Sequence, residues 1–182
     1  MSIINPIHKR IVTAFALTVM FSLPLGAQEV TVDELFDELQ LATVEQTDRI
    51  TKQIETLWSQ SGSASMDLLL KRGVDALQEG DTQAAIEHLS ALIDHAPDFA
   101  EAYYTRATAY FESGLFGPAL ADLHTTLALN PRHFGALTGL AYILEETEEP
   151  EKALDAYRAV LELVPHDETV QEAVSRLEGV AL

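Results

Sequence analysis

The second half of the chain repeats itself at a fixed interval. Three segments align without gaps at a spacing of 34 residues, marked by a shared alanine and a shared proline: Ala85, Ala119, Ala153, Pro97, Pro131 and Pro165. An interval of this length is typical of arrays in which each unit is one supersecondary element that buries its apolar face against its neighbours. Three units in phase therefore constrain the fold more strongly than any single motif in the sequence.

Each unit encodes two helices. In the middle unit Tyr103, Ala107 and Tyr110 recur three or four residues apart, which places them on one helical face. Gly80 and Gly114 then end the first helix, because glycine tolerates the left-handed backbone found just past a helix end. The second helix follows at once and carries the shared alanine. The shared proline ends this helix, since proline cannot continue a helix and disfavours helical geometry in the residue before it.

This pattern resembles the tetratricopeptide repeat (TPR) family. The resemblance covers residues 66–165 and is fullest in the middle unit, at Tyr103, Ala107, Tyr110, Gly114, Ala119, Leu123 and Pro131. Arg72 and Arg106 depart from the family pattern, which usually has leucine there, and Glu148 replaces the turn glycine. The resemblance implies an all-α fold: a right-handed α-solenoid of three TPR helix-turn-helix units with an N-terminal helical pair and a C-terminal capping helix.

The resemblance also divides the chain. A repeat region at residues 63–165 is expected to hold three units, at 66–98, 99–132 and 133–165. Stacked repeats need their exposed ends sealed. A C-terminal capping helix is expected within residues 166–182, because Asp167 can cap a helix whose apolar face begins at Val170.

The N-terminal extension, residues 28–62, is expected to hold a helical pair near 32–41 and 44–59. Each helix opens with the pattern of a capping box: Thr31 with Glu34, and Thr43 with Gln46. The pair also carries Phe36 and Trp58 among its apolar residues. It is interpreted either as a degenerate repeat that seals the N-terminal end of the stack or as a self-association element.

Residues 1–27 have the layout of a secretory signal peptide. Basic Lys9 and Arg10 precede an apolar segment at 11–23, and small residues follow before the expected cleavage after Ala27. We therefore expect a periplasmic protein, with secretion or anchoring to the inner membrane as alternatives. No apolar run reaches the roughly 18–20 residues that a membrane-spanning helix requires, so stable membrane insertion after cleavage is not expected.

The composition excludes several classes of partner and site. The chain has 29 Asp and Glu against 11 Lys and Arg, a net charge of −18. Such a body repels nucleic-acid phosphates and anionic membranes, so we expect no nucleic-acid partner and a preference for cationic ones. The chain has no cysteine, which excludes disulfides, thiolate metal sites and covalent haem attachment.

The sequence carries no catalytic or metal-binding motif. It lacks a G-x-S-x-G nucleophile elbow, an H-E-x-x-H zinc motif and a Gly-rich phosphate loop. The histidines after residue 27 lack the paired spacing of metal ligands: His88, His95, His124, His133 and His166. The last two and His95 lie beside the repeat prolines, where solvent-facing or capping histidines are common. We expect no enzyme, no metal and no cofactor, with a metal-binding protein or enzyme as the remote alternative.

The resemblance implies a binding surface, because the first helix of each TPR unit lines the concave face of the solenoid. Carried over position by position, the partner-binding groove presents Leu70, Val74, Leu77, Tyr104, Thr108, Phe111, Thr138 and Tyr142. Apolar and aromatic side chains framed by acidic residues suit a peptide with apolar anchors and basic flanks. The carboxylate clamp of some TPR co-chaperones is not expected, because its cations are missing. The equally weighted alternative is that the N-terminal helices fold back into this groove or that these side chains pack between the repeats.

The leading hypothesis is a periplasmic TPR scaffold or adaptor that binds a protein or peptide in this groove. A role in cell-envelope assembly follows only by analogy with resembling proteins. The structural alternative is a homo-oligomer that self-associates through its N-terminal helices.

Overall fold

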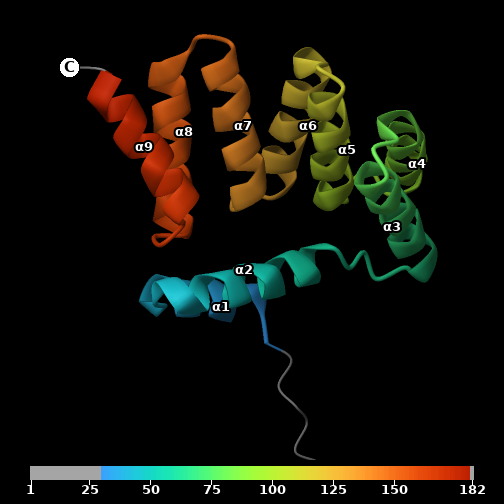
Figure 1. The fold of residues 1–182 in the computed structure, drawn as a ribbon. Helices are drawn as coiled ribbons and strands as arrows, with labels where there is room; N and C mark the ends of the chain where they lie inside the picture. Colours follow the sequence, from blue (N-terminus) through green and yellow to red (C-terminus); the bar gives the residue numbers. More distant parts are fainter. Residues whose placement is uncertain (1–29, 181–182) are drawn as a thin grey trace, which may run out of the picture.

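The computed structural model describes residues 30–180. This part of the chain consists of nine α-helices and holds no β-strand (Figure 1). In chain order they are α1 Val32–Leu41, α2 Val44–Trp58, α3 Ala64–Gln78, α4 Thr82–His95, α5 Ala100–Glu112, α6 Phe116–Leu129, α7 Phe134–Glu146, α8 Pro150–Leu163 and α9 Glu168–Val180. The all-α class is confirmed. The leader expected at residues 1–27 lies outside the described residues.

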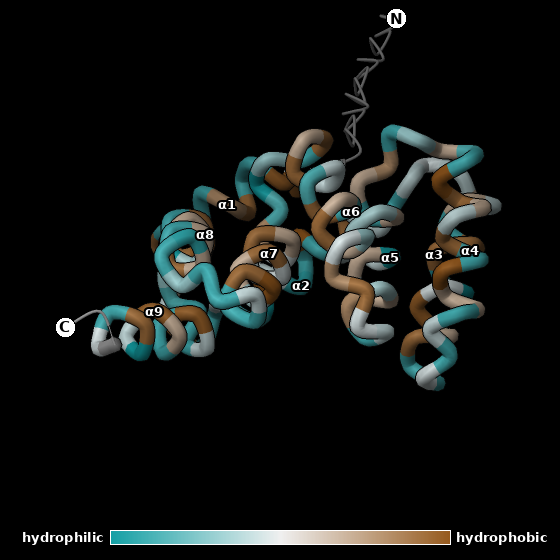
Figure 2. The backbone as a smooth tube through the Cα atoms, turned by 90° about the horizontal axis from the view of Figure 1, so that it is seen from above, coloured by the Kyte–Doolittle hydropathy of each residue, from teal (hydrophilic) through white to brown (hydrophobic). Residues whose placement is uncertain are grey.

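Helices α3 to α8 form three antiparallel pairs that stand side by side, and α9 packs beside the last pair (Figures 1 and 2). Each pair is one repeat unit. The apolar core is divided along this stack: one cluster joins α3, α4 and α5, and a second joins α5, α6 and α7. Helix α5 therefore belongs to two clusters, as expected of a solenoid in which each unit contacts only its neighbours. None of the helices between residues 30 and 180 is long and apolar enough to cross a membrane.

The N-terminal pair packs on the C-terminal part of the stack. A third apolar cluster combines Leu39 of α1 and Ile50 of α2 with Phe134 of α7, Val160 of α8 and Val170 of α9. Figure 1 shows α1 and α2 lying across one end of the repeat helices. The interpretation of this pair as a seal for the N-terminal end of the stack is therefore wrong. Burial of apolar surface is non-directional and independent of sequence distance, so the pair docks where an apolar face is left uncovered.

Polar contacts hold the same interface. The side-chain amide of Gln40 donates to the carbonyl oxygens of Glu162 and Leu163, both at 3.1 Å. These carbonyls end α8, where the last carbonyl groups of a helix have no partner within the helix. Arg132 forms an ion pair with Asp33 across the interface. Helices α1 and α2 are thus bonded to the stack near the turns that follow the second helix of a unit, after α6 and at the end of α8.

Local sequence signals set the helix ends. The Thr31 hydroxyl accepts the N–H of Glu34 at 3.2 Å, and the Glu34 carboxylate accepts the N–H of Thr31 at 2.9 Å, which confirms this capping box. At the next helix the side chain of Gln46 accepts the N–H of Thr43 at 3.0 Å. The Asp167 carboxylate caps α9 by accepting the N–H of Val170 at 3.0 Å. Such side chains satisfy N–H groups that the first turn of a helix leaves free.

The turns inside the units require a left-handed backbone. Gly80 and Gly114 have φ of 78° and 72°. At the equivalent place in the third unit Glu148 has φ of 61°, a conformation that costs a residue with a Cβ roughly 1–2 kcal/mol. The turn geometry is therefore kept even where the sequence lacks the glycine.

Arg106, which stands where the family pattern has leucine, forms a partly buried ion pair. Its guanidinium donates to both carboxylate oxygens of Asp122 at 2.7 and 2.9 Å and to the hydroxyl of Ser90 at 3.0 Å. The rings of Tyr103 and Tyr110 each lie 5.7 Å from it. The ion pair joins α5 and α6 of the second unit, and the hydrogen bond to Ser90 of α4 links this unit to the first.

Candidate partner-binding groove

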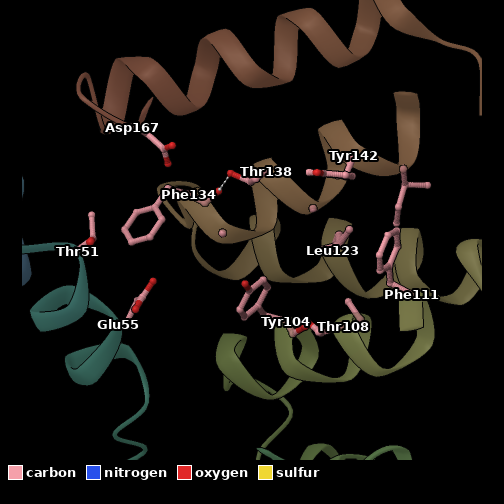
Figure 3. Close-up of a pocket in the computed structure, with 14 residues that line it drawn as sticks. Thr51, Glu55, Tyr104, Thr108, Phe111, Leu123, Phe134, Thr138, Tyr142 and Asp167 are labelled. Atoms are coloured by element: carbon pink, nitrogen blue, oxygen red, sulfur yellow. Dashed lines mark hydrogen bonds between the residues drawn. The ribbon is translucent and has the colours of Figure 1, made fainter. Parts of the chain in front are cut away.

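A groove of about 570 Å³ lies between α5 and α7 (Figure 3). Its two walls come from these helices: Tyr104, Thr108, Phe111, Phe134, Thr138 and Tyr142. On each helix these positions are three or four residues apart, so they share one helical face. Leu123 of α6 lies between the walls. The hydroxyls of both wall threonines donate to carbonyl oxygens of their own helices, which leaves the middle of the groove mainly apolar.

Helix α2 bounds one end of the groove. Its residues Thr51 and Glu55 lie at that end, and Asp167 from the turn before α9 lies near it (Figure 3). Phe111 and Tyr142 lie at the opposite end. The N-terminal helices therefore form one boundary of the groove and leave the space between α5 and α7 unfilled.

Trp58 at the end of α2 fastens this boundary to the repeats. Its ring stacks on His133 with centroids 4.6 Å apart and planes 23° apart, and it lies 5.0 Å from the ring of Phe134 and 6.1 Å from that of Phe36. The ring of Tyr104 lies 4.4 Å from His133 on the groove side. Phe36 and Trp58, which motivated the self-association hypothesis, thus make their aromatic contacts within one chain.

His133 is a buried structural residue with 2 % of its surface exposed. Its Nδ1 accepts the N–H of Ala136 at 3.1 Å and so caps α7. Since Nδ1 is the acceptor, the ring proton is assigned to Nε2, which lies 3.1 Å from the carboxylate of Glu101. The bonding therefore fixes the orientation of the ring on which Trp58 and Tyr104 pack.

The α2 end of the groove is electrostatically distinctive. Partial desolvation and the nearby Glu101 raise the pKa of Glu55 above its ordinary value, although His133 and Lys52 act in the opposite direction. Burial, with the two carboxylates, raises the pKa of Tyr104 to about 12. The phenol of Tyr104 therefore stays protonated and is able to donate a hydrogen bond into the groove. Within residues 30–180, this end of the groove included, no group of three or more histidines and carboxylates is placed to hold a metal ion.

The structure brings together five of the eight residues predicted for the groove: Tyr104, Thr108, Phe111, Thr138 and Tyr142. The three from the first unit lie elsewhere. Leu70 is only 5 % exposed and belongs to the cluster of α3, α4 and α5, and Val74 and Leu77 pack against that cluster. The prediction that Leu70 is presented to a partner is therefore wrong, because α3 turns this residue toward its neighbouring helices.

Other lining residues were missed by sequence reasoning. Phe134 lies four residues before Thr138 on the same face of α7, so the helical period alone indicates it. Gly135 and Gly139 line the groove beside them. Glu55 carries no such signal, because it reaches the groove only through the docking of α2.

Comparison with known proteins agrees with this geometry. Two family models, each described as tetratricopeptide repeat, match residues 104–168 and 76–121. A TPR repeat-containing protein of Rhizobium etli is 35 % identical over 147 residues, which is 80 % of this chain and 72 % of that protein. Mouse DnaJ homolog subfamily C member 3 is 30 % identical over 115 residues, covering 63 % of this chain but only 23 % of the relative.

Solved structures share the fold. The first TPR of Spaghetti (RPAP3) bound to the HSP90 peptide SRMEEVD has a TM-score of 0.61 at 23 % identity, covering 64 % of this chain and 92 % of that one. The crystal structure of MamA protein has a TM-score of 0.60 at 23 % identity, covering 83 % of this chain and 81 % of that one. These matches show the fold. The family models and the Rhizobium relative show that the protein belongs to the tetratricopeptide repeat family.

Proposed function

We propose that this protein is an exported scaffold that binds a protein or peptide partner in the groove between α5 and α7. The observation that carries the proposal is the exposed aromatic pair at one end of the groove. Phe111 and Tyr142 are 36 % and 49 % exposed, and their ring centroids lie 6.5 Å apart. Concave sites lined by aromatic and apolar side chains are the usual form of a binding site.

Two further observations support the proposal. The similar RPAP3 domain is described as bound to an HSP90 peptide, so this fold accommodates peptides. The basic, apolar and small-residue order of residues 1–27 supports export, and we place the mature protein in the periplasm, in assembly or maintenance of the cell envelope. The acidic charge of the chain favours partners with basic flanks.

Differential capture from envelope extracts tests the binding site. We compare the wild-type chain with a Phe111→Ala/Tyr142→Ala variant and identify captured proteins by mass spectrometry. A matched control is Leu115→Ala/Leu129→Ala, which removes two exposed apolar side chains outside the groove. We expect a partner that is lost with the aromatic variant and retained with the control. Identical captures by all three chains would place the binding site elsewhere.

Export has its own test. Expression of the full chain in a bacterial host, followed by fractionation and N-terminal sequencing, should give a periplasmic protein that begins at Gln28. An intact chain in the cytoplasmic fraction would contradict the export proposal and leave the groove assignment untouched.

A further inference from the structure

The two ends of the groove offer different chemistry. Glu55 and Asp167 lie toward the α2 end, whereas Phe111 and Tyr142 form the opposite end (Figure 3). The space between them is bordered by apolar groups such as Leu123. A bound segment therefore meets carboxylates at one end and aromatic rings at the other.

The carboxylates at the α2 end are available to a ligand. Within residues 30–180 the carboxylate of Glu55 forms no ion pair, not even with Lys52 one turn earlier on α2. Asp167 uses Oδ1 to cap α9, which leaves its second oxygen free to accept. Partial desolvation and the nearby Glu101 raise the pKa of Glu55 and outweigh the opposite effects of His133 and Lys52, as expected of a carboxylate that no ion pair neutralises.

The described part of the groove offers no matching site for an anionic group. Among the described residues that line the groove there is no lysine or arginine. Past Tyr142 the surface continues into a smaller hollow that includes Arg176. The guanidinium of Arg176 is paired with both oxygens of Glu145, so its charge is already balanced. The groove is therefore complementary to a cation and lacks a counterpart for a carboxylate.

The helices also set the length of the ligand. Phe134 and Tyr142 are eight residues apart on α7, which corresponds to about 12 Å along the helix axis. An extended peptide covers that distance in about four residues at roughly 3.3 Å each. Groups at the two ends of the groove are thus within reach of side chains four positions apart.

We infer that the groove binds an extended partner segment that places a lysine or arginine at Glu55 and Asp167 and an aromatic side chain against Phe111 and Tyr142. This inference rests on the proposed function and adds the partner's chemistry and direction. Phe111 and Tyr142 supply apolar contact, and the carboxylates supply the preference between charged ligands. Long-range charge favours the same choice, since the whole chain carries −18.

Short synthetic peptides test the inference on the full chain. The probes are acetylated and amidated pentapeptides, Lys-Ala-Ser-Ala-Phe and Glu-Ala-Ser-Ala-Phe, titrated by NMR or calorimetry at low salt. We expect the lysine peptide to bind about fivefold more tightly than the glutamate peptide, as for an accessible charge pair. The Glu55→Gln variant should reduce this ratio to below about twofold. The matched control Glu162→Gln, an exposed carboxylate on α8, should preserve it.

The outcomes separate this inference from the proposed function. Equal or stronger binding of the glutamate peptide, or an unchanged ratio in Glu55→Gln, overturns the inference. The absence of binding by either peptide also overturns the inference. A dimer whose formation needs Phe111 and Tyr142 overturns it as well, because the occupant of the groove would then be a second copy of this chain. Partner capture that depends on the aromatic pair would still stand in each of these cases except the dimer.

Discussion

Replacing Gly73 with alanine should bring no gain in stability and a net cost of up to about 2 kcal/mol, although the repeat pattern suggests that alanine fits. The equivalent residues of the other two units are Ala107 and Ala141. A Cβ on Gly73 would lie 2.6 Å from Cγ and 2.7 Å from Cδ2 of Leu89. Carbon atoms in contact normally lie about 3.5–4.0 Å apart. Leu89 has no exposed surface, so the core must absorb a displacement of about 1 Å.

Gly139→Ala is the matched comparison. A Cβ there would lie 3.4 and 3.5 Å from the methyl groups of Leu123, which is ordinary contact. Both variants gain about 1 kcal/mol of helix propensity, because both glycines lie inside helices. The clash at Gly73 costs about 1–3 kcal/mol in a well-packed core. The two variants should therefore differ by about 1–3 kcal/mol in the free energy of unfolding, with Gly139→Ala the more stable.

Urea denaturation and thermal melts followed by circular dichroism measure this difference. For a protein of this size it corresponds to about 2–12 °C between the two melting temperatures. Equal helical content before unfolding is the control that both variants are folded. If Gly73→Ala is as stable as Gly139→Ala, the argument from the Leu89 contact is refuted.

Three further predictions follow from the same structure. Glu148→Gly should stabilise the protein by about 0.5–1 kcal/mol in urea denaturation, because glycine adopts φ of 61° without a Cβ penalty; a loss of stability would contradict this. Trp58→Ala should lower the free energy of unfolding by about 2–4 kcal/mol and speed amide hydrogen exchange in α1 and α2, since the Trp58 ring stacks on His133. Unchanged exchange would show that other contacts hold α1 and α2 on the repeats. Binding of the lysine pentapeptide should weaken as pH falls through the raised pKa of Glu55, because protonation removes the anion that faces the ligand. Glu101, His133 and Lys52 are the charged groups that act on this pKa. In Glu55→Gln this pH dependence should be lost, and a persistent one would assign it to another group.

The sequence by itself determined the local structure. The 34-residue interval, the turn glycines and the capping residues indicated the repeat helices, the N-terminal pair and the final helix, and the structure has each of them. These signals suffice because a helix is built from hydrogen bonds and side-chain contacts between residues three or four apart. The resemblance to the family, carried over position by position, indicated Tyr104, Thr108 and Phe111 as groove residues, and they share one wall of the groove.

Only the tertiary structure decided how these helices combine. It placed α1 and α2 on the C-terminal units, buried Leu70 and brought Glu55 to the end of the groove. It also made His133 the buried contact between Trp58 and Tyr104. Such outcomes depend on which apolar faces remain uncovered after the repeats have stacked, and residues far apart in the chain supply those faces. No pattern within one helix records that competition, so the groove's acidic end became visible only in the folded chain.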